Sequence, residues 1–462
     1  MVTTFLLTIA GATLTLLGST KPTWALNNGV AKLPTLGYNT WNAFQCNIDE
    51  DLILETAHLM KSLGLQDAGY NYVNIDDCYA EKNRTADGDI IEDRVRFKNG
   101  MKKLNQQVHA LGFKTGIVSL DTLATIMDAP DEVQYSDSGW FTCGGYPGSW
   151  GNELRDLRTF SNWGFDYLKY DNCAIPYDSI TRTGMVGKYQ RMADAVKQVA
   201  KETRKLPIVF SLCQWGWSQV WLWGAELGQS WRTTGDIAPA WESLTFIINF
   251  NSFLTQATDF YGRNDLDMLQ LGNGGLTFEE AKSHFTAWAL MKSPLLIGTN
   301  LSSITPDILG ILKNKEILEI NQDPIVGKSI SPFRWGINPD WTSNSTHPAQ
   351  YWSGPSKDGT VIMLLNTLDE PATMTFNLTE SPWIDAGRQY SVRDLWAHTD
   401  NGTAVRNFTA PDVPPHGVVA LLLKDAGNEP AGLFPECSVW WQCTDKNGTR
   451  DEAWKQADSS GS

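Results

Sequence analysis

The chain has 462 residues, of which 42% are hydrophobic and 19% are charged, and its formal net charge is −15. This composition is typical of a globular protein, and the length allows more than one hydrophobic core. The negative charge disfavours polyanions and anionic membrane surfaces, so we expect neither nucleic acid nor a membrane as a partner.

The chain begins with an apolar segment, FLLTIAGATLTLLGS, over residues 5–19. Its length is that of a signal peptide, and it is too short and too interrupted by Gly and Thr to span a bilayer. We predict a signal peptide over residues 1–20, with cleavage between about residues 18 and 25. The sequence Thr23-Trp24-Ala25 offers one acceptable cleavage site. The protein is therefore expected to be secreted and extracellular.

Glycosylation sequons of the form Asn-X-Ser/Thr are dense along the chain, which agrees with secretion. They predict glycosylation at Asn83, Asn300, Asn344, Asn377, Asn401, Asn407 and Asn447.

The chain has seven cysteines, so at least one thiol stays unpaired within the chain in an oxidising compartment. No CxxC pair or histidine cluster has the spacing of a zinc site, and we expect no metal. No GxGxxG follows the first predicted strand, so we expect no dinucleotide and predict no cofactor.

Short apolar runs alternate with amphipathic helical stretches from about Lys32 to Gly298. In the helical stretches apolar residues recur at intervals of three and four, as at Ile53, Ala57 and Met60. Eight such units over about 250 residues indicate a (β/α)8 TIM barrel, with a doubly wound open sheet as the competing interpretation. We place this α/β barrel at residues 26–328. Its predicted strands are 36–41, 72–77, 113–117, 166–171, 207–213, 230–236, 258–262 and 293–298.

The pattern changes after Asn321-Gln322-Asp323-Pro324. Strand-like runs separated by Gly, Pro, Asp and Asn turns follow, with no helices between them, and these predict an antiparallel β-sandwich over residues 329–425. We expect residues 426–462 to form a C-terminal extension that is partly disordered. Cys437 and Cys443 in this extension could close a small loop, for which we assign no function.

Acidic residues recur where the predicted barrel strands end, which is where active sites lie in this fold. A single acid at such a position is more often a solvated loop residue or a helix N-cap, but acids at the same end of several strands converge in space. In YLKYDNC, Lys169 and Asp171 share one face of a strand. We also expect Arg232, Thr234 and Asp236 on one face of strand six. The simpler interpretation of each of these pairs, Lys169 with Asp171 and Arg232 with Asp236, is an ion pair in the barrel interior that has no catalytic role. The acids are Asp76, Asp77, Asp171, Asp236, Asp265 and Asp267.

Tryptophans accompany these acids at strand ends, at Trp41, Trp215 and Trp217. Glycoside hydrolysis requires two carboxyl groups on either side of an anomeric carbon, together with polar groups for sugar hydroxyls and aromatic faces for sugar rings. The pattern therefore favours a glycosidase.

Seven motifs resemble glycoside hydrolase family 27, the melibiase-type α-galactosidases, and within it the secreted fungal α-galactosidase B group. In chain order they are LGYNTWNAFQCNI, YNYVNIDDC, YSDSGWFTCGGYPGS, WGFDYLKYDNC, SLCQWGW, SWRTTGDI and RNDLDMLQLGNGGLT. The resemblance covers about residues 32–425. It implies a retaining exo-α-galactosidase that releases terminal galactose from melibiose, raffinose or galactomannan side chains, with Asp171 as nucleophile and Asp236 as proton donor and acid/base.

The resemblance also implies the substrate contacts. Asp76 and Asp77 would bind the 4- and 6-hydroxyls of galactose, Lys169 the 3- or 4-hydroxyl, and Arg232 the 2- and 3-hydroxyls. The other residues expected around the sugar are Trp41, Tyr135, Cys143, Cys213, Gln214, Trp215, Gly216, Trp217 and Asp267. The disulfides implied are Cys46–Cys78 and Cys143–Cys173, which leaves Cys213 as a free thiol.

Gln214 stands where many members of the family have Glu. Its bulk, with that of Trp217, favours a sugar with a free 2-hydroxyl over one with an N-acetyl group. An α-N-acetylgalactosaminidase, a β-L-arabinopyranosidase and a non-catalytic sugar-binding protein remain as alternatives.

Residues 118–134 form an additional segment, since the family continues from Gly-Ile directly to Tyr-Ser-Asp. We interpret the segment either as a loop beside the substrate channel or as an in-frame retained intron. The intron is favoured because Val118-Ser119 can be encoded by a splice-donor sequence and Gln134 by an acceptor end. If the segment is translated, Val118 and Ser119 compete with Tyr135 and Ser136 for the end of strand three.

Overall fold

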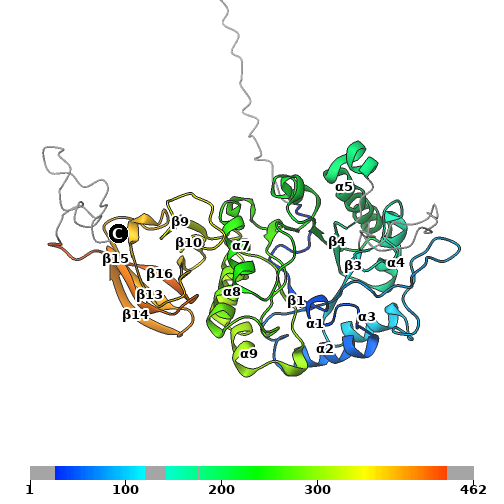
Figure 1. Cartoon of the computed structure of the whole chain (residues 1–462), viewed down its shortest axis with the longest axis horizontal. Helices are drawn as coiled ribbons and strands as arrows, with labels where there is room; N and C mark the ends of the chain where they lie inside the picture. Colours follow the sequence, from blue (N-terminus) through cyan, green and yellow to red (C-terminus); the bar gives the residue numbers. More distant parts are fainter. Residues whose placement is uncertain (1–25, 120–141, 174–176, 434–462) are drawn as a thin grey trace, which may run out of the picture.

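A computed structural model describes residues 26–119, 142–173 and 177–433 (Figure 1). The predicted signal peptide, Tyr135, most of the additional segment, Asn447 and the Cys437/Cys443 pair lie outside the described residues. In the described ranges, no helix has both the length and the apolar character needed to cross a membrane.

The first part of the chain is the predicted α/β barrel. Its strands pair in parallel in the order β7-β6-β5-β4-β3-β2-β1-β8. Between β7 and β8 the described chain has an isolated parallel bridge, Leu269 with Ile297, instead of a ladder. The strands are β1 Leu36–Asn39, β2 Tyr72–Ile75, β3 Lys114–Ser119, β4 Tyr167–Asp171, β5 Val209–Cys213, β6 Ser230–Arg232, β7 Arg263–Asp265 and β8 Leu295–Ile297.

Helices surround these strands, and their apolar stripes face inward. Ile53, Ala57 and Met60 are fully buried, as the spacing predicted. Local signals fix the helix ends: Asp49 caps α2, and Thr277 and Glu280 form a capping box on α8. The α-helices are α1 Trp41–Phe44, α2 Glu50–Ser62, α3 Met101–Ala110, α4 Glu153–Trp163, α5 Tyr177–Thr203, α6 Gly224–Leu227, α7 Trp241–Ser252, α8 Phe278–Leu290, α9 Pro306–Leu312 and α10 Lys315–Asn321. The 3₁₀ turns are η1 Trp217–Leu222, η2 Thr255–Ala257, η3 Leu301–Ser303 and η4 Leu378–Glu380.

One predicted strand was wrong in position and another was too long. Residues 258–262 form a tight turn, because the Asp259 amide donates to the Gly262 carbonyl and Tyr261 has φ of 63°, so β7 begins only at Arg263. Strand six ends at Arg232, and Thr234 and Asp236 therefore lie in the following loop. This loop folds back over Arg232, whose Nη2 donates to the Thr234 carbonyl at 3.2 Å, and an extended strand could not make that bond.

The first residues of the additional segment belong to β3. Val118 pairs with Lys169 and Ser119 pairs with Tyr170 in the parallel ladder to β4. Val118 is 1% exposed. In this chain the segment therefore supplies the C-terminal end of strand three, directly beside the strand that carries Asp171.

The second part is the predicted antiparallel β domain, with strand order β12-β15-β14-β13-β16-β11-β10-β9. The sheet curls around a core of its own, which includes Ile362, Leu364 and Leu421. Its strands are β9 Ser331–Arg334, β10 Tyr351–Ser356, β11 Gly359–Leu365, β12 Ala372–Asn377, β13 Arg388–Asp394, β14 Thr399–Val405, β15 Asn407–Val413 and β16 Val418–Asn428.

The apolar run of β11 is continuous because both faces of this strand are buried. Ile362 and Leu364 face the core of the β domain, while Val361, Met363 and Leu365 belong to the same buried cluster as the barrel helices. In Figure 1 the β domain lies at the side of the barrel that carries α7 and α8. One hydrophobic cluster thus continues from the barrel into the β domain, next to the core that this domain has of its own.

We predict that Met363→Ala lowers the free energy of unfolding by about 2–5 kcal/mol, because it leaves a cavity in this shared cluster. Urea denaturation followed by tryptophan fluorescence measures the change. The matched control is Lys424→Ala on the neighbouring strand β16, since Lys424 is exposed and should change stability by less than about 0.5 kcal/mol. If Met363→Ala instead unfolds the β domain in a separate early transition, the two parts do not share this cluster.

Candidate active site

Charged side chains converge at the C-terminal ends of the barrel strands, where the sequence predicted them. Asp76 and Asp77 follow β2, and Asp267 follows β7. Lys169 and Asp171 lie on β4, and Arg232 ends β6. All six side chains are buried. Such a concentration of buried charge is costly unless each group has a partner or a function.

Lys169 lies between two of these carboxylates. Its Nζ is 3.2 Å from Asp76 Oδ2 and 3.7 Å from Asp171 Oδ2. Burial opposes the charge on Lys169, but Asp76, Cys213 and Asp171 outweigh it and raise the pKa of the lysine well above its usual value. Burial raises the pKa of Asp171, and the charge of Lys169 counteracts this rise. The lysine is therefore the main group that favours the ionised form of Asp171.

Short hydrogen bonds hold the two aspartates after β2. Asn39 Nδ2 donates to Asp76 Oδ2 at 2.8 Å, and the Asp76 amide donates to Thr40 Oγ1 at 3.0 Å. Asp77 accepts hydrogen bonds from the amides of Cys78 and Gly144 at 2.6 and 2.7 Å. A Cβ at Gly144 would lie 2.7 Å from Asp77 Oδ2, so this close approach requires glycine.

Trp41 begins α1 next to this group and is partly buried. Its amide donates to Asn39 Oδ1 at 2.9 Å, so one asparagine links Trp41 to Asp76.

Arg232 forms the second charged group of the site. Its Nη2 lies 2.9 Å from Asp267 Oδ2 and 3.0 Å from Asp236 Oδ1. The side chain of Asp267 is 4% exposed, whereas that of Asp236 is 72% exposed. Burial raises the pKa of Asp267. Although the Asp236 side chain is exposed, the surrounding protein partly desolvates its carboxylate and acts to raise the pKa. The charges of Arg232 and Lys169 outweigh this effect and lower the pKa below its usual value.

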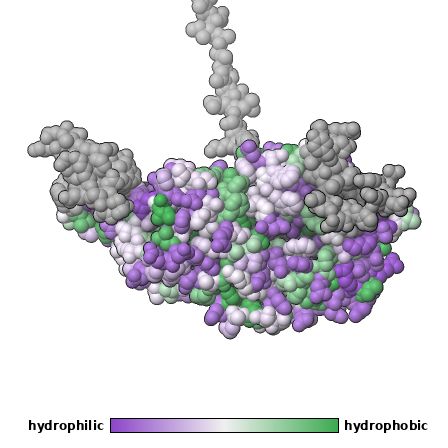
Figure 2. Space-filling model, in the orientation of Figure 1, coloured by the Kyte–Doolittle hydropathy of each residue, from purple (hydrophilic) through white to green (hydrophobic). Residues whose placement is uncertain are grey.

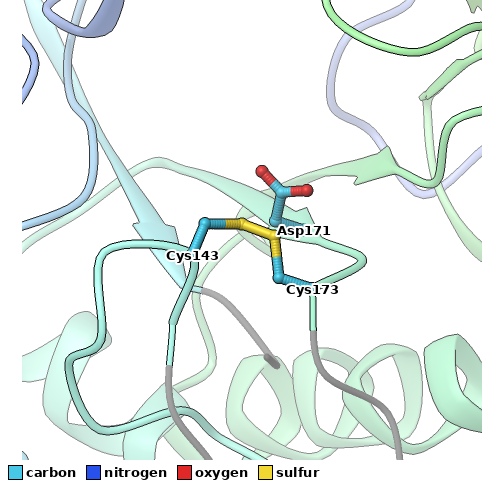
Figure 3. Close-up of side chains that lie close together, drawn as sticks. All are labelled: Cys143, Asp171 and Cys173. Carbon is cyan, nitrogen blue, oxygen red and sulfur yellow. A yellow bond between two sulfur atoms is a disulfide. The ribbon is translucent and has the colours of Figure 1, made fainter. Parts of the chain in front are cut away.

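Both disulfides implied by the resemblance are present, Cys46–Cys78 and Cys143–Cys173. The second joins the loops after β3 and β4 beside Asp171, and its two sulfur atoms lie within 4.8 Å of an Asp171 carboxylate oxygen (Figure 3). These sulfurs are bonded to each other, so the three side chains do not form a metal site. Cys213 is buried and is the free cysteine of the described chain, as predicted.

The loop after β5 brings Gln214, Trp215, Gly216 and Trp217 to the same end of the barrel. The Gly216 amide donates to the Arg232 carbonyl at 3.1 Å. Gly216 has φ of 84°, and a Cβ there would lie 2.1 Å from the Thr233 carbonyl oxygen. Glycine therefore lets this loop lie on β6. Trp217 is 54% exposed at the rim. The buried side-chain amide of Gln214 has no hydrogen-bond partner among the described residues.

Several residues that position the charged groups were not among the predicted site residues. Asn39 and Thr40 contact Asp76, and the amide of Asn172 donates to Asp171 Oδ1 at 2.7 Å. Asn172 in turn accepts a hydrogen bond from the buried Lys188 at 3.3 Å. Asn39, Thr40 and Asn172 were detectable, because each is a polar residue at a predicted strand end. Lys188 carried no such signal, since it lies within the pattern of helix α5.

A cavity of about 530 Å³ lies at the opposite end of the barrel, next to residues that precede β2 to β5 or begin them. Two of its polar side chains contact each other, since Asp166 Oδ2 lies 2.9 Å from His109 Nε2, and Asp166 also accepts a hydrogen bond from the Thr115 backbone amide at 3.0 Å. Residues at this end of a barrel serve stability more often than catalysis. The candidate active site is therefore the charged cluster at the C-terminal ends.

Two family models match the chain and together cover both parts of the fold. The model described as "Alpha galactosidase A" matches residues 33–323, and "Alpha galactosidase C-terminal beta sandwich domain" matches residues 346–423. The chain belongs to the α-galactosidase family. This confirms the resemblance to melibiase-type enzymes, and with it the class of glycoside hydrolase and the barrel followed by a β-sandwich.

Individual relatives agree with this family. A probable α-galactosidase B of Talaromyces emersonii is 41% identical over 86% of this chain and 93% of its own length. The crystal structure of α-galactosidase I from Mortierella vinacea has a TM-score of 0.76 at 34% identity, and covers 88% of this chain and 100% of that one. The structure of an α-galactosidase from Saccharomyces cerevisiae with raffinose has a TM-score of 0.74 at 28% identity, and the match covers 86% of this chain and 99% of that one.

Asp265, at the end of β7, generates a pH prediction for this α-galactosidase. Burial, together with repulsion from Asp267, raises the pKa of Asp265 to about 6. The pKa of an unfolded aspartate is about 3.9, so the folded state binds this proton more tightly. The resulting stability is complete below about pH 4 and is lost as the pH rises to about 6.

We therefore expect that, as the pH rises from 4 to 6.5, the free energy of unfolding of Asp265→Asn increases relative to that of the unmodified chain, by up to about 3 kcal/mol. Asparagine keeps an acceptor for the Asp267 amide, which donates to Asp265 Oδ1 at 2.9 Å. Urea midpoints across this pH range measure the effect, with the exposed Asp87→Asn as control. Parallel pH profiles for Asp265→Asn and the unmodified chain would contradict the prediction.

Proposed function

We propose that the chain is a secreted, retaining exo-α-galactosidase. It releases terminal non-reducing α-D-galactose from oligosaccharides such as melibiose and raffinose and from galactomannan side chains. Asp171 attacks the anomeric carbon, and Asp236 first protonates the leaving oxygen and then activates water. The observation that carries this proposal is the pair of carboxylates in contrasting surroundings, one buried beside Lys169 and one exposed beside Arg232.

The surroundings of Asp171 suit a nucleophile. Attack at the anomeric carbon requires the carboxylate form, and Lys169 at 3.7 Å stabilises that form against the effect of burial. The Asn172 amide bonds to Oδ1 at 2.7 Å, while Lys169 contacts Oδ2. Both carboxylate oxygens are thus oriented by fixed groups.

The surroundings of Asp236 suit a group that changes its protonation state. Arg232 holds Asp236 ionised, as the second, base-catalysed step requires. A galactoside would cover the exposed carboxylate and offer its hydroxyls to Arg232. Both changes raise the pKa of Asp236, so the bound substrate itself prepares the acid for the first step.

The remaining groups suit recognition of one sugar with several hydroxyls. In the proposal Asp76, Asp77 and Lys169 bind the 3-, 4- and 6-hydroxyls, and Arg232 binds the 2- and 3-hydroxyls. Gln214, Trp217 and Asp267 adjoin the 2-position, where bulk favours a free hydroxyl over an N-acetyl group. Trp41, Cys143, Cys213, Trp215 and Gly216 complete the site. The raffinose complex of the yeast α-galactosidase supports a galactose-containing substrate.

We predict that Asp171→Asn lowers kcat on every galactoside by at least about 10³-fold, because no other group can form the glycosyl ester. The loss of activity caused by Asp236→Asn should depend on the leaving group of the substrate. The loss should be large on raffinose, because its leaving oxygen must be protonated. It should be small for the first step of dinitrophenyl α-galactoside hydrolysis, because dinitrophenolate leaves without a proton. Steady-state and burst kinetics on both substrates test this, with Asp87→Asn as an exposed control.

Equal losses on both substrates for Asp236→Asn would remove it from the acid role. A chain that hydrolyses α-N-acetylgalactosaminides or β-L-arabinopyranosides better than α-galactosides would overturn the proposed specificity. Binding of galactose without any turnover would identify a sugar-binding protein instead.

A further inference from the structure

Hydrophobic and hydrophilic residues are mixed on the face seen in Figure 2. One group of large apolar side chains lies outside the active site, at the contact between α7 and the loop after β9. Trp341 is 71% exposed, Ile337 is 50% exposed and Phe253 is 37% exposed. The rings form a row, because the fully buried Trp335 lies 5.7 Å from Phe253 and 4.8 Å from Trp341. Trp341 is the outermost ring of the row and presents most of its surface to solvent.

A glycosylation sequon begins three residues after this tryptophan, at Asn344-Ser345-Thr346. The asparagine amide is already oriented. Its Oδ1 accepts hydrogen bonds from the amides of Thr346 and His347 at 3.0 and 3.2 Å. One hydrogen of its Nδ2 is donated to Asn338 Oδ1 at 2.9 Å, which leaves the other for a substituent.

The loop that carries both residues is anchored to the barrel. The Asn344 amide donates to Asn249 Oδ1 on α7 at 3.1 Å, and Asn249 Nδ2 donates to Ser343 Oγ at 2.9 Å. At its other end, the Thr342 amide closes a turn onto the Pro339 carbonyl at 3.2 Å. Trp341 and Asn344 are therefore held at a fixed separation on one short loop.

We infer that Asn344 carries an N-linked glycan whose first N-acetylglucosamine packs on the exposed face of Trp341. This inference rests on the secretion in the proposed function. A polyprenyl-pyrophosphate oligosaccharide supplies the sugar: the Nδ2 atom bonds to its C1, the pyrophosphate leaves, and the amide loses one proton. The C–H groups of the sugar then cover apolar surface that this fold otherwise leaves in water.

The sequon at Asn83 lacks this arrangement. Asn83 is exposed, but the residues before it, Ala80, Glu81 and Lys82, include no ring. Asn83→Gln is for this reason the control, since it removes a glycan from a sequon that no aromatic residue precedes by three positions.

The test uses the full chain secreted from a eukaryotic host, with Trp341→Ala, Asn344→Gln, the double variant and Asn83→Gln. Glycopeptide mass spectrometry measures occupancy at Asn344, and calorimetry measures the unfolding temperature. We expect Asn344 to be occupied, and Asn344→Gln to lower the unfolding temperature by about 2 °C, with no change for Asn83→Gln. Trp341→Ala should lower the unfolding temperature more in the glycosylated chain than in the Asn344→Gln background.

Trimming with an endoglycosidase that leaves only the first N-acetylglucosamine provides a second measurement. The unfolding temperature should stay unchanged, because the first sugar makes the contact. An unoccupied Asn344, or an equal cost of Trp341→Ala in both backgrounds, would overturn the inference. Hydrolysis of nitrophenyl α-galactoside by the same preparations should be equal in all variants. Absence of hydrolysis would contradict the proposed function and leave the glycan result intact.

Discussion

The site depends on one buried cation, Lys169, shared between Asp76 and Asp171. Burying three charges on neighbouring strands would destabilise the barrel if any one stood alone, since an unpaired buried charge costs several kcal/mol. The lysine offsets this cost and also favours the ionised form of Asp171, although burial leaves the pKa of this carboxyl above its usual value. Because β2 and β4 are separated only by β3, both carboxylates reach the same ammonium group. The geometry of the parallel barrel thus places Asp171 beside the cation that the proposed nucleophilic attack requires.

A second cation, Arg232, pairs with the two other carboxylates of the site. It holds the buried Asp267 and the exposed Asp236 with the same nitrogen atom. The two carboxylates that the mechanism requires therefore differ in exposure and in the direction of their pKa shifts. In the free chain these shifts favour protonation of Asp171 and ionisation of Asp236, the reverse of what the first step of the proposed mechanism needs. That step therefore depends on Lys169 to ionise Asp171 and on the bound substrate to raise the pKa of Asp236.

Much of this arrangement could be predicted from the sequence. Alternating strands and helices indicated the barrel, and acids after consecutive apolar runs indicated its active end. The motifs that carry the family resemblance led to the two disulfides. Strand six was predicted too long because the loop after Arg232 folds back over its guanidinium, and strand seven was placed too early because the aromatic residues Phe260 and Tyr261 lie in a tight turn before β7. The partner Asn172 is adjacent to Asp171 in the chain, but the contacts of Asp76 with Asn39 and Lys169 join different strands, and a linear pattern does not contain them.

The most direct test of the account is to trap the intermediate that Asp171 should form. A 5-fluoro-α-galactosyl fluoride reacts with a retaining enzyme and leaves it slowly, so intact-protein mass spectrometry would detect one added fluorogalactosyl group. The account predicts that peptide mapping places this group on Asp171 and that Asp171→Asn stays unlabelled. A label on another carboxylate, or rapid turnover of galactosides with inversion at the anomeric carbon, would contradict it.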